Sequence, residues 1–91
     1  MNRVKVYVEV FARFTSDGKL LPVALIWEDG SKYLIDRIVK YERCASRRAG
    51  GAGIMYTCMI AGQECHLFYE ENQKWFLERI YYFIHKIFAN I

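Results

Sequence analysis

Hydrophobic and polar residues alternate along most of the chain, and the period of the pattern changes near its end. Up to about Glu78 the apolar residues alternate in short runs separated by Asp17-Gly18, Asp29-Gly30 and Ala61-Gly62, three pairs typical of tight turns. From Ile80 the apolar residues are spaced by three and four instead. Alternation is typical of strands with one buried face, and the second spacing of a helix with one apolar stripe. The pattern therefore predicts a small antiparallel sheet followed by a C-terminal amphipathic helix.

The turn pairs divide the first part of the chain into six predicted strands, at residues 3–14, 20–28, 32–41, 54–60, 64–70 and 74–78. The second strand is apolar almost throughout, which predicts a central position in its sheet. Strands joined by tight hairpins form a meander, and a short meander tends to curl into a small barrel. We therefore predict a mainly β single domain over residues 1–91. Its residues 1–79 form a six-stranded antiparallel meander, as a small SH3-like barrel or curved sheet, and residues 80–91 form one α-helix.

The inward positions of these elements predict the hydrophobic core. We expect these side chains to be largely buried: Val4, Val6, Val8, Val10, Leu25, Trp27, Ile35, Ile38, Tyr56, Cys58, Leu67, Tyr69, Trp75, Leu77, Phe83, Ile84 and Ile87.

Composition narrows the class of protein. A hydrophobic fraction of 54% over 91 residues allows a core to form without metal or disulfide help, and a net charge of +3 does not by itself imply nucleic acid. Met1-Asn2-Arg3 leads directly into an alternating strand, and no stretch approaches the roughly 18 consecutive apolar residues of a membrane span. We therefore expect no secretory segment and no membrane partner. Three cysteines, an odd number, favour a reducing cytoplasm over a disulfide framework.

The sequence shows no pattern typical of catalysis or metal binding. Cys65 and His66 are adjacent, so on a strand they point to opposite faces, and the chain has no Cys-x-x-Cys pair. The paired acids fall at predicted hairpin turns, and His85 falls on the polar side of the predicted helix. General acid–base chemistry needs a titratable group held by an orienting partner, and the chain shows no such pair. We expect a protein that is not an enzyme, with no catalytic residue, metal or cofactor.

The basic residues gather around the one long predicted connection, residues 42–53. Its arginines and glycines could offer guanidinium donors and bare backbone amides to phosphate, and flanking tyrosines could stack on single-stranded bases. The candidate contacts to nucleic acid or phosphate are Arg43, Arg47, Arg48, Gly50, Gly51 and Tyr41. A flexible, solvated crossover whose arginines maintain solubility is the alternative interpretation of the same segment.

The predicted helix and the first strand provide a second candidate surface. The helix stripe must be buried, because an isolated helix of this length is marginal in water. It could pack on its own sheet or on a second copy of the chain, and symmetric pairing would also cover an open sheet edge. The candidate residues for self-association are Tyr7, Phe11, Phe83 and Ile87.

A motif runs from Leu25 to Ile38 as Leu-x-Trp-x-x-Gly-x-x-Tyr-x-Ile-x-x-Ile. It is followed by Tyr-x-Cys-x-Ile at 56–60, Leu-Phe-Tyr at 67–69 and Trp-Phe-Leu-Glu-Arg at 75–79. This pattern resembles a family of small, functionally uncharacterised bacterial all-β proteins, some of them encoded near error-prone DNA-polymerase genes. The resemblance implies a bacterial origin and a DNA-related binding role. We therefore predict a non-enzymatic binding module that contacts nucleic acid through residues 43–53; a protein-interaction or homodimerisation module without nucleic acid is the alternative.

Overall fold

The protein is built almost entirely from antiparallel strands. The computed structural model describes the backbone of residues 3–46 and 51–80 and the side chains of residues 5–43 and 53–78. The strands are β1 (Arg3–Tyr7), β2 (Glu9–Phe14), β3 (Leu20–Ile26), β4 (Lys32–Leu34), β5 (Arg37–Ser46), β6 (Gly51–Ile60), β7 (Gln63–Glu70) and β8 (Trp75–Ile80). They form a five-stranded sheet in the order β1-β8-β7-β6-β5 and a three-stranded sheet in the order β2-β3-β4. The prediction of a mainly β, antiparallel fold is confirmed.

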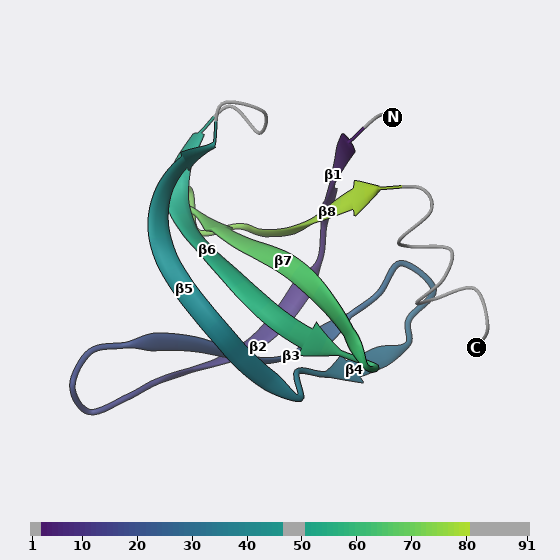
Figure 1. Cartoon of the computed structure of the whole chain (residues 1–91), viewed down its shortest axis with the longest axis horizontal. Coiled ribbons are helices and arrows are strands. Elements are labelled where there is room, and N and C mark those ends of the chain that lie inside the picture. The colour runs from purple at the N-terminus through teal and green to yellow at the C-terminus, as the bar shows by residue number, and fades with distance from the viewer. Residues whose placement is uncertain (1–2, 47–50, 81–91) are drawn as a thin grey trace.

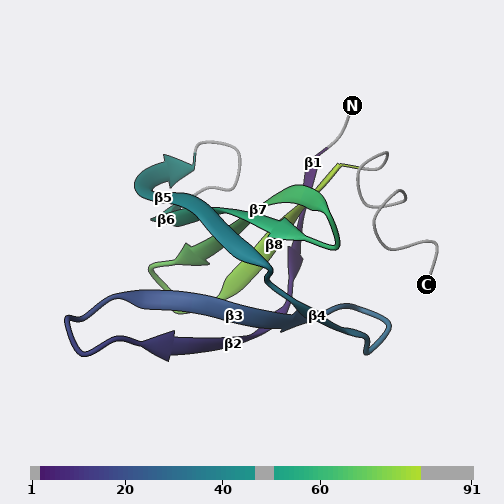
Figure 2. The ribbon, with the colours of Figure 1, turned by 60° about the horizontal axis from the view of Figure 1, so that its bottom comes forward.

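Two of the predicted strands are each shared between the sheets. Predicted strand 3–14 breaks at Val8 into β1 and β2, and predicted strand 32–41 breaks at Ile35–Asp36 into β4 and β5. Figure 1 shows β5, β6 and β7 as long curved strands, and Figure 2 shows β2 and β3 as a separate layer across one end of them. The two breaks therefore connect the two layers.

The predicted meander is confirmed in its pairing. Every predicted pair of consecutive strands is present, as β2–β3, β3–β4, β5–β6, β6–β7 and β7–β8. The predicted central strand is β3, which lies between β2 and β4. One further pair, β1 with β8, joins the first strand to the last, with Arg3 opposite Ile80.

The predicted SH3-like barrel is wrong, because the two sheets do not close on each other. β4 pairs with β3 only over Ala24, Leu25 and Ile26. The amide of Ile35 still donates to the carbonyl of Val23 on β3, and the chain then leaves β3 and pairs with β6 of the other sheet from Arg37 onward. The first half of β3 and the middle of β5 therefore separate, and an opening lies between them.

Two predicted boundaries also need correction. The connection predicted at residues 42–53 is mostly a hairpin, because β5 continues to Ser46 and β6 begins at Gly51. Ladder pairing extends these strands through residues of low β propensity, since tertiary context can override propensity. The helix predicted from Ile80 starts too early, because Ile80 is the last residue of β8 and pairs with Arg3. Residues 81–91 lie outside the described residues, and residues 3–46 and 51–80 contain no helix.

The core lies between the two sheets, where the predicted burial is largely confirmed. Buried as predicted are Val6, Leu25, Trp27, Tyr56, Cys58, Leu67 and Leu77. Partly buried and packed against them are Val8, Val10, Ile35, Ile38, Tyr69 and Trp75. The side chains of Val4, Phe83, Ile84 and Ile87 lie outside the described ones.

A second cluster, on the opposite face of the five-stranded sheet, was not predicted. There the Phe68 and Phe76 rings stack with centroids 4.7 Å apart, and Met55 packs against them. In a strand with one buried face, the side chains on the other face are expected to be polar. Burial of side chains on both faces of this sheet was therefore not expected. The five-stranded sheet is therefore apolar on its inner face and along a strip of its outer face.

Candidate functional site

A pocket lies at the opening between the two sheets. Its volume is about 490 Å³, within the roughly 300–1,000 Å³ typical of small-ligand sites. It is lined by Phe14, Gly18, Lys19, Leu20, Tyr41, Glu42, Arg43, Ile54, Tyr56 and Tyr69. These residues come from two parts of the chain, the β2–β3 hairpin and the strands β5, β6 and β7, so the pocket exists only because the sheets part here.

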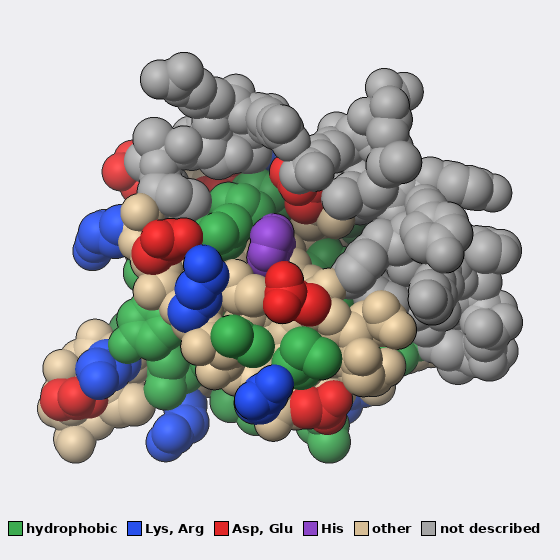
Figure 3. All heavy atoms as spheres, viewed as in Figure 1, with side chains coloured by type: hydrophobic (Ala, Val, Ile, Leu, Met, Phe, Trp, Pro, Cys, Tyr) green, Lys and Arg blue, Asp and Glu red, His purple; other side chains and the backbone are tan. Residues whose placement is uncertain are grey.

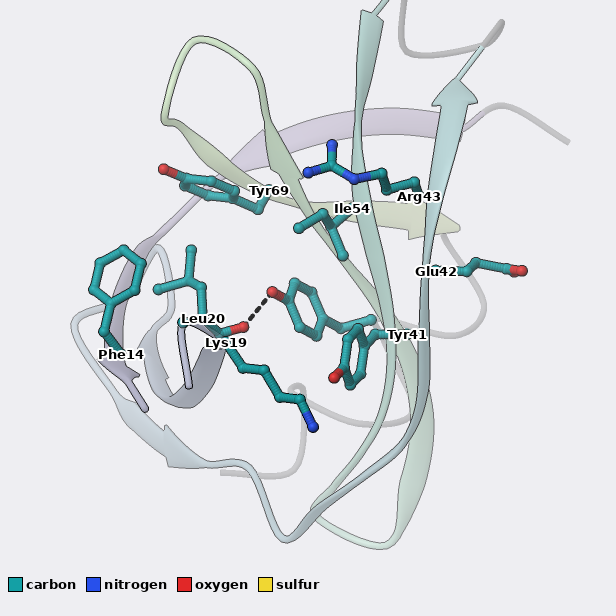
Figure 4. A pocket seen from close by; sticks show the side chains of 10 residues that line it. Phe14, Lys19, Leu20, Tyr41, Glu42, Arg43, Ile54 and Tyr69 are labelled. Carbon is teal, nitrogen blue, oxygen red and sulfur yellow. Dashed lines mark hydrogen bonds between the residues drawn. The ribbon is translucent and has the colours of Figure 1, made fainter. Parts of the chain in front are cut away.

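The strand register explains the floor of the pocket. Arg43, Ile54 and Tyr69 are direct cross-strand neighbours on β5, β6 and β7, so their side chains share the inner face. The opposite wall is the end of the β2–β3 hairpin, where Phe14 pairs with Leu20. Figure 4 shows Phe14, Leu20 and Tyr69 on one side of the hollow and Arg43 and Tyr41 on the other.

The pocket is rich in aromatic rings that are held against one another. Tyr41 stacks on Tyr56 with ring centroids 5.5 Å apart, and Tyr56 lies 5.5 Å from Trp75. Tyr69 lies 4.7 Å from the same tryptophan. Two rings remain available to a ligand, because Phe14 is 76% exposed and Tyr41 is 43% exposed. The site therefore presents two flat apolar surfaces, of which the Tyr41 ring rests on the buried ring of Tyr56.

One hydrogen bond ties the two walls together. The hydroxyl of Tyr56 donates to the backbone carbonyl of Leu20, across the opening between β6 and β3 (Figure 4). Burial raises the pKa of Tyr56 to about 12, so this hydroxyl stays protonated and able to donate throughout the physiological range. The bond satisfies a carbonyl at the point where β3 has parted from β4, and it sets the width of the pocket.

The charged side chains at the pocket are mainly basic. Lys19 and Arg43 line it from opposite walls, whereas the side chain of Glu42 points away from the hollow in Figure 4. Lys19 also lies 3.7 Å from the exposed carboxylate of Asp17. On the face of the molecule seen in Figure 3, the described acidic and basic side chains are interspersed, with hydrophobic side chains between them. Positive charge thus coincides with exposed aromatic rings at the pocket.

The backbone of β5 also faces this opening. In the antiparallel β5–β6 ladder, hydrogen-bonded and non-hydrogen-bonded pairs alternate. The two-residue turn at Ala61–Gly62, both with positive φ, makes Ile60–Gln63 a hydrogen-bonded pair and so fixes the alternation through β6. It follows that the amide and carbonyl groups of Tyr41 and Arg43 point away from β6. They form the outer edge of the five-stranded sheet beside the pocket.

The structure brings together two of the residues predicted to contact nucleic acid. Tyr41 and Arg43 both line the pocket. Gly51 is the first residue of β6, and Arg47, Arg48 and Gly50 lie outside the described residues. Sequence reasoning missed the hairpin wall, Phe14, Lys19 and Leu20, because nothing local shows that this hairpin lies opposite β5. Tyr69 was assigned to the core, and only the register reveals that it and its neighbour Ile54 extend beyond the smaller sheet.

Of the residues predicted for self-association, the structure describes Tyr7 and Phe11, and it places them on different sheets. Tyr7 lies on the outer face of the five-stranded sheet, with its hydroxyl 2.8 Å from Glu70 and its ring 5.9 Å from Phe76. Phe11 lies on β2, on the outer face of the other sheet. Phe83 and Ile87 lie outside the described residues. The break at Val8 separates Tyr7 from Phe11, so a single strand edge carrying both does not exist.

The two thiols that the structure describes, Cys58 and Cys65, show no arrangement for chemistry. Cys58 and Cys65 are cross-strand neighbours and both are buried, and burial raises the pKa of each thiol to about 12. Both are therefore protonated near neutral pH and poor nucleophiles. Among the described residues, no group of three His, Cys, Asp or Glu side chains could hold a metal ion.

Comparisons with known proteins found no matching family model, no similar curated protein and no similar solved structure. The resemblance to the bacterial all-β family therefore stays a prediction. Within the described part of the chain, no helix has the length and apolar character needed to cross a bilayer. The geometry of the pocket is accordingly the basis for any functional assignment.

Proposed function

We propose that this protein is a non-enzymatic binding module that takes single-stranded nucleic acid into the pocket between its two sheets. The observation that carries the proposal is the coincidence, in one pocket, of two exposed aromatic rings, Phe14 and Tyr41, with two cations, Lys19 and Arg43. Proteins that bind single strands combine these same elements, since every base has a π-face and every nucleotide a phosphate.

The geometry favours a single strand over a duplex. A base can reach Phe14 or Tyr41 only with its face free, because in a duplex both faces are occupied by stacking. The cations on opposite walls would neutralise phosphates on either side of the inserted base, and Arg43 can do so with two parallel hydrogen bonds. The Tyr56–Leu20 hydrogen bond fixes the spacing of the walls before binding, which reduces the ordering cost.

Fluorescence anisotropy with a labelled single-stranded oligonucleotide tests the proposal. We expect binding to weaken steeply between low and moderate salt. Replacing Phe14 with Ala should weaken it about tenfold or more, because base stacking contributes roughly 1–3 kcal/mol per base. Arg43→Gln should make the plot of log K against log salt shallower by about 0.7, the value for one phosphate contact on a single strand.

Lys40→Gln is the matched control for Arg43→Gln. Lys40 is exposed on the same strand but its side chain points to the outer face, so removing its charge should leave the affinity nearly unchanged. Equal losses of affinity in Lys40→Gln and Arg43→Gln would mean that only the net charge of the protein matters and that the pocket is not the binding site. Absence of binding at low salt would refute the nucleic-acid proposal altogether.

The free edge of β5 favours a second candidate, a protein partner. An extended peptide could pair with the outward amide and carbonyl groups of Tyr41 and Arg43 and place a side chain in the pocket. Affinity for such a partner would respond little to salt and would survive Arg43→Gln. Under either candidate the buried thiols Cys58 and Cys65 fit a reducing compartment, and we propose the cytoplasm.

A further inference from the structure

The outer face of the three-stranded sheet carries an apolar row that is distinct from the pocket. Phe11, Ala24 and Leu34 are direct cross-strand neighbours on β2, β3 and β4. They point away from the core, because the adjacent row, Val10, Leu25 and Tyr33, packs into it. Phe11 is 45% exposed and Leu34 is 63% exposed, whereas the small Ala24 between them is buried. Two large apolar side chains thus flank a shallow centre.

A charged row borders the apolar one on the same face. Glu9, Ile26 and Lys32 are cross-strand neighbours two residues along each strand. Glu9 therefore lies on the β2 side and Lys32 on the β4 side, and both are exposed. The ammonium group of Lys32 lies 4.8 Å from the centroid of the Phe11 ring, so its long side chain extends across this face. The face is apolar in the middle, with Glu9 on its β2 edge and, on its β4 edge, a lysine whose long side chain can reach across it.

We propose that this face pairs with the same face of a second copy of the chain. A two-fold axis along β3 exchanges the β2 side with the β4 side. It sets Phe11 of one copy against Leu34 of the other, and Glu9 of one against Lys32 of the other. Each contact then occurs twice, as a closed symmetric dimer requires. Lys32 exchanges its contact with the Phe11 ring for the glutamate of the second copy.

The face is small, since β4 has only three residues, so the dimer is a weak one of the transient class. The position of this face on the molecule determines how the dimer would affect ligand binding. The pocket opens at the hairpin end of the three-stranded sheet, beside Phe14 and Leu20, whereas the paired rows lie towards the other end of β3, beside β4. A dimer joined there keeps both pockets open and presents two binding sites to one ligand, which raises the effective affinity for a long strand.

Reversing the charges tests the arrangement. Sedimentation velocity over a range of concentrations into the millimolar should show the mass rising from 10.8 kDa towards twice that value. Glu9→Lys and Lys32→Glu should each weaken the dimer about tenfold, because each converts two attractive pairs into two repulsive ones. An equimolar mixture of the two variants should dimerise again, because every lysine then faces a glutamate.

Two further variants complete the experiment. Glu64→Lys makes the same charge change on the other sheet and should leave self-association intact, whereas Leu34→Ser should weaken it without unfolding an exposed position. Retained melting temperatures establish that each variant is folded. A protein that stays at 10.8 kDa at millimolar concentration overturns the proposal. If Glu9→Lys and Lys32→Glu leave the dimer affinity unchanged, or if the two variants do not dimerise when mixed, the dimer does not form through this face.

Discussion

At the scale of single residues, Tyr56 joins the core to the candidate site. Its ring is fully buried between Tyr41 and Trp75, and its hydroxyl reaches across the opening to the carbonyl of Leu20. A tyrosine suits this position because its ring packs like a core residue and its end can still donate a hydrogen bond. One side chain therefore contributes both to folding and to the shape of the pocket.

Tyr56→Phe should retain the packing and remove only this hydrogen bond. We expect a loss of about 1–2 kcal/mol, because the Leu20 carbonyl is left without its partner. In a domain of this size that corresponds to a fall in melting temperature of roughly 4–15 °C. Thermal unfolding followed by circular dichroism measures it. An unchanged melting temperature would mean that the hydrogen bond does not hold the two sheets together.

A second group of residues forms an ion pair and hydrogen bonds on the outer face of the five-stranded sheet. Lys5 of β1 and Glu70 of β7 lie on either side of β8 and meet above Phe76, with 2.9 Å between ammonium nitrogen and carboxylate oxygen. The hydrogen bond from Lys5, and then the one from Tyr7, hold the pKa of Glu70 below its ordinary value of 4.5. The hydrogen bond to Glu70 raises the pKa of Lys5 above 10.5.

The sign of these shifts predicts a pH dependence at acid pH. A depressed carboxyl pKa means that the stabilisation is complete above pH 4.5 and is lost as the pH falls through the lowered value. The raised pKa of Lys5 keeps the lysine charged over this whole range. The melting temperature of Glu70→Gln should therefore decline less between pH 5 and pH 2.5 than that of the unaltered protein. Glu71→Gln, at an exposed neighbouring position, should follow the unaltered protein.

At the scale of elements, the close packing of β6 against β7 depends on one glycine, Gly53. A Cβ added at Gly53 would lie 2.1 Å from the carbonyl oxygen of Tyr69 on β7, far inside contact distance. The two backbones approach each other here because residue 53 has no side chain. The close approach lies next to the Arg43–Ile54–Tyr69 row, so it also determines where the floor of the pocket lies.

Gly53→Ala should destabilise the protein by about 1–3 kcal/mol, the usual cost of forcing an extra methyl group into a packed site. Urea unfolding measures this. Gly18→Ala is the comparison, since Gly18 has nothing within 4 Å of an added Cβ and only its positive φ opposes alanine. A smaller loss in Gly53→Ala than in Gly18→Ala would contradict the clash.

The elements also show what the sequence could and could not predict. Alternation predicted the strands and turn pairs predicted their partners, because both signals are local. The breaks at Val8 and Ile35–Asp36 leave no such signal. Val6, Val8 and Val10 face the core on both sides of a break, so the period continues while the partner strand changes. The pocket depends on those breaks, and hence only its β5 residues, Tyr41 and Arg43, were predicted.

At the scale of the whole molecule, stability should be unevenly distributed. β6, β7 and β8 each have a paired strand on both sides, whereas β2 and β4 are edge strands of a three-stranded sheet. Interior strands open only with the whole fold, and edges open locally. We expect amide hydrogen exchange to be slowest in β6 and β7 and much faster in β2 and β4. Uniform exchange across both sheets would instead show that they unfold as a single unit.

The pairing of β1 with β8 has a consequence for the protein during its synthesis. Arg3 to Tyr7 are synthesised before the other described strands, and their partners, Phe76 to Ile80, are synthesised after them. The β2–β3–β4 hairpins can form during translation, whereas β1 has an unpaired edge until nearly all of the described chain has emerged from the ribosome. Contacts between such distant residues form slowly, and open edges invite pairing with other chains. The nascent chain is therefore most exposed to misassembly just before translation brings β8 to its place between β1 and β7.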